Sequence, residues 1–99
     1  MAELNQIIHQ PIRLQIMASL VTLKSDSAVD FTTLRDLLDL TDGNLGAHLH
    51  KLEESGYIVI NKEFVDRKPR SFISATQLGR SVFQEHVEAL EAILKSSEG

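Results

Sequence analysis

The 99-residue sequence contains no cysteine and no tryptophan, with only two prolines and five glycines. Without cysteine, the chain can form neither disulfide bonds nor thiolate metal sites. The stretch from Ile12 to Leu23 is too short and too polar to cross a bilayer, because Arg13 and Gln15 interrupt it. The start, with Glu3, lacks the basic residues and apolar run of a signal peptide. We therefore expect a location in a reducing cytoplasm, with no membrane contact.

The residues that are present fit a single domain over 1–99. Hydrophobic residues make up 42% and charged residues 24% of the chain, a composition typical of a globular protein with one core. The net charge of −4 argues against nucleic-acid binding if the charge is evenly spread. It is not evenly spread: residues 62–80 carry five basic and two acidic side chains, so the positive charge gathers there.

Apolar spacing predicts three helices in the first half of the chain. The first covers about 11–24, with Pro11 in its first turn, and a very short strand over 29–31 follows it. Thr32 or Thr33 is expected to cap a short second helix that carries Leu34, Leu37 and Leu38. Thr41 is expected to cap the third helix, over 42–55, which ends at Gly56 and directs three leucines into the core: Leu45, Leu49 and Leu52.

The pattern changes to β at Tyr57. A strand is predicted over 57–65, a charged turn over 66–70 and a partner strand over 71–75. Thr76 then caps a long helix over about 77–95. The predicted fold class is therefore mainly α with a small β hairpin (α+β).

Two short helices followed directly by a hairpin with a basic tip are typical of a winged helix-turn-helix. In the DNA-binding version, the second helix of the pair enters the major groove and the hairpin, or wing, reaches the adjacent backbone or minor groove. Asn44 suits the edge of adenine, and Ala47 suits a thymine methyl group. The full set of predicted groove contacts on helix 42–55 is Gly43, Asn44, Gly46, Ala47, His50 and Lys51. The alternative is a solvated helix face with no ligand.

The hairpin tip carries Arg67, Lys68 and Arg70, with Pro69 among them. Such a charge run is often only solvated surface. Directly after a helix-turn-helix, we interpret it as a contact to DNA phosphates or to the minor groove.

The last helix has two adjacent apolar stripes, of which one covers the domain's own core. The other is expected to be exposed in a single chain and to form a homodimer interface, so that two recognition helices lie about 34 Å apart. Together with the N-terminal apolar residues, this interface is Leu4, Ile7, Ile8, Val82, His86, Ala89, Leu90 and Ile93. Alternatively, the N-terminal segment covers this face within one chain. His86 at an interface would make dimerisation depend on pH.

Four runs carry a family resemblance: Thr41-Asp42-Gly43-Asn44-Leu45-Gly46-Ala47-His48-Leu49, Leu52-Glu53-Glu54-Ser55-Gly56-Tyr57, Arg67-Lys68-Pro69-Arg70 and Thr76-Gln77-Leu78-Gly79-Arg80. They resemble the small winged-helix transcriptional regulators of the MarR and ArsR type. The resemblance implies a dimeric double-stranded-DNA-binding protein, usually a repressor, with a recognition helix over 42–55 and a wing over 57–75. The cysteine motif of metal-sensing ArsR members is absent, and no metal or other cofactor is expected.

No phosphate loop, nucleophile elbow or Ser/His/Asp order indicates an enzyme. Two other functions stay open. The helix face and the wing could meet another protein instead of DNA, or a DNA-binding dimer could also bind a small effector molecule.

Overall fold

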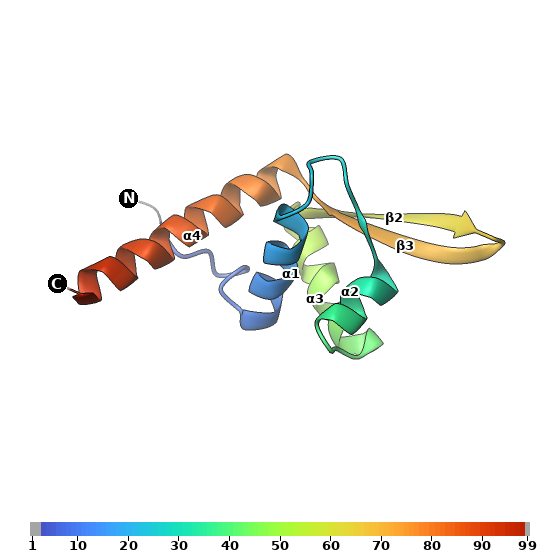
Figure 1. The fold of residues 1–99 in the computed structure, drawn as a ribbon, viewed down its shortest axis with the longest axis horizontal. Helices are drawn as coiled ribbons and strands as arrows, with labels where there is room; N and C mark the ends of the chain where they lie inside the picture. The colour runs from blue at the N-terminus through green and yellow to red at the C-terminus, as the bar shows by residue number, and fades with distance from the viewer. Residues whose placement is uncertain (1–2, 99) are drawn as a thin grey trace.

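The computed structural model describes residues 3–98 and has the predicted order of elements (Figure 1). The helices are α1 (Pro11–Val21), α2 (Phe31–Leu37), α3 (Asp42–Glu54) and α4 (Gln77–Glu98). The strands are β1 (Val29–Asp30), β2 (Ile58–Val65) and β3 (Lys68–Ala75). The fold class is confirmed: a mainly helical domain with a small antiparallel sheet, whose strands lie in the order β1-β3-β2.

β2 and β3 form a longer and tighter hairpin than the sequence predicts. Their register runs from Ile58 opposite Ala75 to Val65 opposite Lys68, so the turn consists of Asp66 and Arg67 alone. Both turn residues have positive φ, 51° and 67°, as a two-residue hairpin turn requires. The predicted five-residue turn over 66–70 is therefore wrong.

Pro69 suggested a turn to sequence reasoning, but it belongs to β3, opposite Phe64. The pair next to the one that closes a two-residue turn is not hydrogen-bonded between the strands. Pro69 can therefore occupy this position without removing a bond from the ladder. As a result, Lys68 and Arg70 lie in β3, and Arg67 is the one residue of the basic run that lies in the turn.

The core lies where α1, α2 and α3 meet the base of the sheet. It contains the three leucines predicted on α3, and Ile58 and Ile73 contribute from the sheet. Burying a side chain of this size stabilises a fold by about 1.5–3 kcal/mol. The fully or almost fully buried apolar residues are Ile8, Ile16, Met17, Leu20, Leu34, Leu45, Leu49, Leu52, Ile58 and Ile73.

The ends of α3 follow the sequence, whereas the start of α2 does not. The Thr41 hydroxyl accepts a hydrogen bond from the Asn44 backbone N–H at 3.1 Å, and Gly56, with φ of 80°, follows α3 in a left-handed conformation. The expected cap of α2 at Thr32 or Thr33 is wrong. Asp30 is the cap, because the extended backbone at the end of β1 lets its carboxylate accept from the Thr32 N–H.

The N-terminal segment, residues 3–10, packs against the middle of α4. The Asn5 backbone N–H donates to Nδ1 of His86 at 3.0 Å, and the Asn5 side-chain amide donates to the Tyr57 hydroxyl at 3.0 Å. The His9 ring meets the His86 ring edge-to-face, with centroids 5.4 Å apart. The alternative that this segment covers α4 within one chain therefore holds for the middle of the helix, around His86.

This packing corrects the expected dimer surface. Ile8 and His86 are fully buried in a single chain and Ala89 almost fully, so the expectation that they are exposed is wrong. Leu4, Ile7, Val82 and Leu90 are half-buried. Ile93 is 50% exposed, because the second half of α4 extends beyond the helical body (Figure 1). The helix also continues three residues past the predicted end at Lys95.

The molecule is elongated, with extents of 57 × 25 × 21 Å. In Figure 1, the far end of α4 and the tip of the hairpin point in opposite directions from the bundle of α1, α2 and α3. Among the described residues, none of the helices is both long and apolar enough to span a membrane.

Candidate nucleic-acid interface

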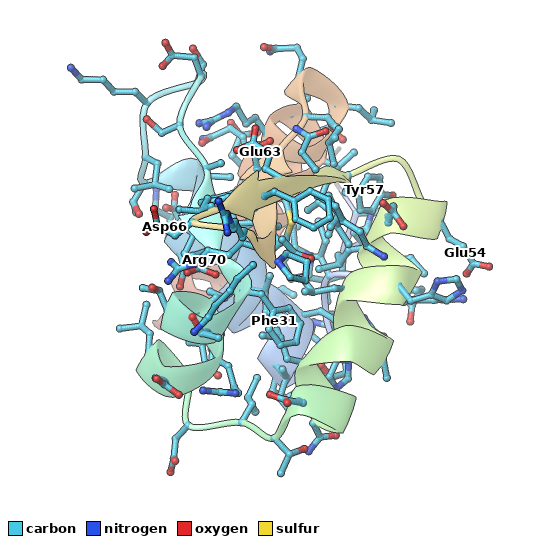
Figure 2. The ribbon with its side chains drawn as sticks, turned by 90° about the vertical axis from the view of Figure 1, so that its right-hand side faces the viewer. Phe31, Glu54, Tyr57, Glu63, Asp66 and Arg70 are labelled. Carbon is cyan, nitrogen blue, oxygen red and sulfur yellow. The ribbon has the colours of Figure 1, made fainter. Side chains whose placement is uncertain are left out.

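The outward face of α3 carries the residues predicted for it. Gly43, Asn44, Ala47, His50 and Lys51 are all exposed and Gly46 is half-buried, while the leucines on the opposite side of the helix are buried. Seen along the hairpin in Figure 2, α3 lies on one side below the sheet and α2 on the other. The predicted separation of a core face from a free face is therefore confirmed. The contact of these residues with DNA stays a prediction.

Ion pairs around Arg35 hold the start of α3. Arg35 of α2 donates to the Asp42 carboxylate at 2.7 Å and to Asp36 at 3.0 Å. The hydrogen bond to Asp42 and then the one to Asp36 raise the pKa of Arg35. The carboxylate of Asp42 also lies in the first turn of α3, where it interacts favourably with the helix dipole. This contact connects the two helices at the end of α3 that carries Gly43 and Asn44.

His48 lies on the flank of α3 and is half-buried. Arg13 of α1 donates to Nδ1 of His48 at 3.2 Å, so this ring nitrogen acts as an acceptor. Burial, and secondarily the charge of Arg13, lowers the pKa of His48. His48 therefore anchors α3 to α1. His50, in contrast, is exposed, and its Nε2 lies 3.7 Å from a carboxylate oxygen of Glu54.

The basic residues of the wing differ in whether they form ion pairs. Arg67 and Lys68 are exposed at the tip, and within residues 3–98 neither forms an ion pair. Arg70 of β3 instead donates to the carboxylate of Asp30 at 2.9 Å, and Asp30 ends the neighbouring strand β1 and caps α2. Part of the charge predicted for DNA is therefore already used to hold the wing against α2.

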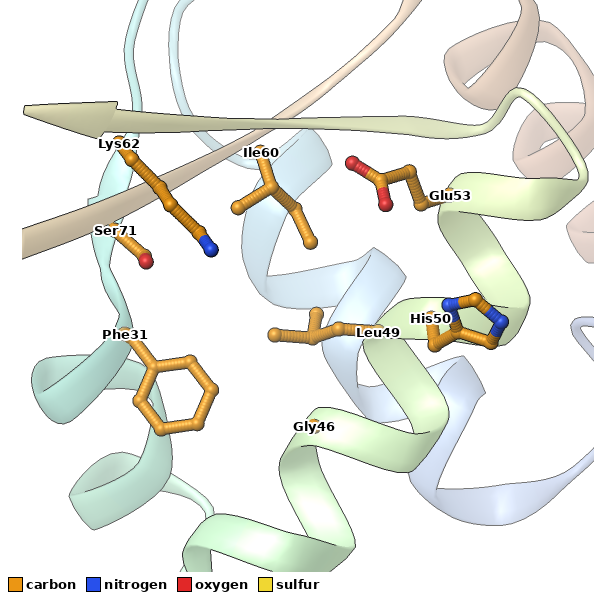
Figure 3. A pocket seen from close by; sticks show the side chains of 8 residues that line it. All are labelled: Phe31, Gly46, Leu49, His50, Glu53, Ile60, Lys62 and Ser71. Carbon is orange, nitrogen blue, oxygen red and sulfur yellow. The ribbon is translucent and has the colours of Figure 1, made fainter.

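A groove of about 460 Å³ runs between α3 and the wing (Figure 3). Its apolar floor is Phe31, Leu49 and Ile60. Gly46 lines the groove from α3. A methyl carbon added at this glycine would meet nothing within 4 Å. The polar lining comes from both sides: His50 and Glu53 from α3, and Lys62 and Ser71 from the wing. The free face of α3 and one face of the wing thus border the same groove.

Sequence reasoning missed two residues on that face of the wing. Ile58, Ile60, Lys62 and Phe64 occupy every second position along β2, so all four lie on the same face of the sheet. The alternation is visible in the sequence, whereas the position of this face beside α3 depends on tertiary packing. Phe64 is 79% exposed, more than any other large apolar side chain among the described residues.

The described residues contain no group of three or more histidine, aspartate or glutamate side chains that could hold a metal ion. His9 and His86 are the one histidine pair in ring contact among them. Nδ1 of His86 accepts from Asn5, and its buried Nε2 has no partner within residues 3–98. Burial, and secondarily the charge of His9, lowers the pKa of His86.

Comparison with known proteins agrees with this geometry. Residues 12–94 match the family model of the winged helix DNA-binding domain. An uncharacterized protein of Methanocaldococcus jannaschii is 32% identical over 93 residues, covering 94% of this chain and 98% of the relative.

Solved structures of transcriptional regulators share the fold. A transcriptional regulator homologue from Pyrococcus horikoshii OT3 is 29% identical with a TM-score of 0.86, covering 96% of this chain and 91% of the other. A MarR-family regulator from Enterococcus faecalis V583 is 22% identical with a TM-score of 0.69, at 93% and 76% coverage. The MepR protein of S. aureus, solved in a complex with DNA, is 15% identical with a TM-score of 0.75, at 94% and 73% coverage.

The predicted resemblance is thus confirmed for the fold, including its likeness to the MarR type. The matched residues span α1 to most of α4 and so include the α2–α3 pair, the wing and the groove between them. This chain belongs to the winged helix DNA-binding domain family.

Proposed function

We propose that this protein is a transcriptional regulator that binds double-stranded DNA in a sequence-specific manner as a homodimer. One observation carries the proposal: the free face of α3 and the Lys62 face of the wing border one groove, so a single duplex can meet both. The family description and the DNA complex of MepR, which has the same fold, support DNA as the partner.

In this proposal α3 enters the major groove. Asn44, in the first turn of α3, offers a donor and an acceptor that match the adenine edge, and Ala47 is placed one turn later for a thymine methyl group. Gly43 and Gly46 leave open space around the helix, so its backbone can approach the DNA closely. His50 and Lys51 then face base edges or phosphates near the end of the helix.

The wing supplies the contacts that depend on charge. Arg67 and Lys68 at the tip and Lys62 in the groove are exposed cations, each suited to one phosphate. Arg70 plays a different part, because its ion pair with Asp30 orients the wing on α2. The net charge of −4 predicts weak binding to DNA in general, so affinity should depend on a matched site.

Salt dependence tests the role of the wing. We expect the triple variant Lys62→Ala/Arg67→Ala/Lys68→Ala to weaken binding to every duplex. It should flatten the slope of log K against log salt by up to about 0.9 for each lost phosphate contact. Fluorescence anisotropy with a labelled duplex, selected from a random pool, measures both quantities. Lys24→Ala removes an exposed charge from the loop after α1 and should change neither. An unchanged slope in the triple variant would show that the wing does not contact phosphates.

Sequence preference tests the role of α3. Replacing Asn44 with alanine should relax the preference at one base pair of the selected site, with a loss of about 1–3 kcal/mol of discrimination there. Selection from a random pool with the wild type and the variant compares the two preferences. Failure of the wild-type protein to enrich any sequence at low salt would contradict DNA binding and favour a protein partner.

The dimer is proposed from the second half of α4. Leu90 is half-buried, Ile93 is 50% exposed and Leu94 is 63% exposed, and these three form what we call the distal apolar patch. Apolar side chains three and four residues apart lie on one side of a helix, which suits packing against the same helix of a second copy. A two-fold pair would place its recognition helices to read two half-sites about 34 Å apart.

Light scattering at micromolar concentration tests the dimer. The wild type should have about twice the 11.1 kDa mass of one chain, and Ile93→Glu should shift it to a monomer because a buried unpaired charge is costly. Glu88→Gln, on the exposed polar side of α4, is the control and should stay dimeric. A monomeric wild type contradicts the dimer.

We also propose repression as the regulatory output. Occupation of promoter DNA by itself excludes other proteins from the same site, whereas activation needs a further contact with the transcription machinery. Transcription in vitro from a template with the selected site should fall as protein is added. A rise would contradict repression while leaving DNA binding intact.

A further inference from the structure

Phe64 is exposed in a place where exposure is costly. Its ring is 79% exposed near the end of β2, two residues before the turn. A phenylalanine left in water forgoes the stabilisation that burial of its surface would supply. Two-residue hairpin turns and strand ends are stable with polar side chains at such positions. The gain for the folded chain is limited to a cross-strand contact with Pro69, worth at most about 1 kcal/mol.

The neighbours of Phe64 favour an anionic partner with an apolar interior. On its face of the outer wing lie Lys62, Ser71 and Pro69, the last of which is its cross-strand partner. The carboxylate of Glu63 belongs to the other face, where Glu63 is opposite Arg70. The Phe64 face of the outer wing thus combines an apolar pair, a hydroxyl and a cation, while the carboxylate that shares the groove with Lys62, that of Glu53, belongs to α3.

The wing also has a suitable length. Ile60 lies at the groove beside α3, and Phe64 is four residues further along β2. At about 3.3 Å per residue this is roughly 13 Å. On DNA whose helical turn is about 34 Å, the minor groove lies roughly half a turn, about 17 Å, from the centre of the major groove. Phe64 can therefore reach the neighbouring minor groove when α3 occupies the major groove.

We propose that Phe64, supported by Pro69, is an apolar wedge that enters the minor groove and partly unstacks one base step. The inference rests on the DNA-binding function proposed above and deepens it. Arg67 and Lys68 at the tip would hold the flanking phosphates while the ring separates the bases. Such wedges kink the duplex towards the major groove by about 20° or more.

The wedge adds a source of specificity that makes no hydrogen bond to a base. Pyrimidine–purine steps such as TA and CA unstack more easily than other steps. The selected site should therefore contain such a step on the outer side of each major-groove contact. Loss of the aromatic ring should remove this preference without changing the preference at the base pair that Asn44 reads.

The test uses the full-length protein and the selected duplex. We would compare the wild type with Phe64→Ala, and use Phe64→Leu as the conservative variant because leucine also serves as a wedge. The matched control is Val65→Ala, which removes an exposed apolar side chain from the next position, on the other face of the hairpin. Energy transfer between dyes at the two duplex ends reports bending, and 2-aminopurine at the pyrimidine–purine step reports unstacking.

For the wild type we expect a bend and a rise in 2-aminopurine fluorescence. Phe64→Ala should lose both and bind roughly 5- to 140-fold more weakly, the effect typical of removing an aromatic ring from a base. Phe64→Leu should retain part of each signal, and Val65→Ala all of it.

Two results overturn the wedge while leaving DNA binding intact. One is an unbent duplex with the wild type. The other is a bend and fluorescence signal that Phe64→Ala preserves, whether or not its affinity falls, because the ring would then touch DNA without insertion. Failure of the wild type to bind any duplex contradicts the proposed function itself and is recognised by the absence of an anisotropy change.

Discussion

The buried histidine of α4 should make the stability of the fold depend on pH. His86 is 0% exposed, and its Nδ1 accepts the Asn5 N–H, so the neutral ring carries its proton on the buried Nε2. A second proton on the ring would turn Nδ1 from an acceptor into a donor, which would then face the Asn5 N–H, also a donor. Together with desolvation and the nearby charge of His9, this agrees with a pKa that is lowered in the folded state.

The sign of the effect follows from the direction of the shift. In the unfolded chain a histidine binds a proton near pH 6.5, whereas folded His86 does so only at lower pH. Above about pH 6.5 both states are neutral, so the free energy of unfolding does not depend on this group. As the pH falls below that value, the unfolded state binds more protons and stability decreases, by up to about 1.4 kcal/mol per pH unit for one histidine. The loss stops below the folded pKa.

The variant His86→Asn isolates this contribution. Its amide oxygen keeps an acceptor near the position of Nδ1 but does not titrate, so the variant should lose stability at pH 7.5 and lose less than the wild type on acidification. The two curves of unfolding free energy should therefore converge between pH 6.5 and 5. Urea unfolding followed by circular dichroism at a single protein concentration measures them.

Val82→Ala is the control, since it removes apolar packing from the same helix, outside the distal apolar patch, without a titratable group. Its curve should run parallel to that of the wild type. Curves for His86→Asn that are parallel to the wild type across this range would refute the reasoning. Hydrogen exchange gives a second readout, because the protection of the Asn5 amide in the wild type should decrease together with the free energy of unfolding as the pH falls below about 6.5.

Three further perturbations test the packing around the candidate interface. Gly79→Ala places a methyl carbon 2.0 Å from the backbone oxygen of Tyr57, so it should destabilise the fold by about 1–3 kcal/mol or more in urea unfolding. An unaltered midpoint would contradict the close approach of α4 to the Tyr57 backbone. The methyl carbon added by Gly46→Ala meets nothing within 4 Å, so the substitution should stabilise α3 by up to about 1 kcal/mol while weakening DNA binding. Equal or tighter binding would show that close approach of the α3 backbone to DNA is unnecessary. Thr41→Ala removes the cap of α3 and should cost about 1 kcal/mol, whereas Thr41→Ser should restore most of it, and a loss shared by both would point away from the hydroxyl.

The sequence by itself determined the order of elements and the two sides of α3. Leucines at positions 45, 49 and 52 recur at helical spacing, and Thr41 and Gly56 mark the two ends, so local chemistry is enough to decide which side is buried. The same holds for β2, where alternation places Ile58 and Ile60 on one face. These features depend on neighbours within a few residues along the chain.

Only the tertiary structure decided which partners distant residues find. Asn5 and His86, which form a hydrogen bond between the N-terminal segment and α4, are more than 80 residues apart in the sequence. No periodicity indicates that Ile8 and His86 are covered within one chain. The pairing of Arg70 with Asp30 likewise depends on β1 lying beside β3, which leaves Arg67 and Lys68 as the free cations among the predicted wing contacts. The hairpin register places Phe64 opposite Pro69 on the Lys62 face. A pattern shows which side of an element is apolar, but what covers that side depends on how the elements pack together.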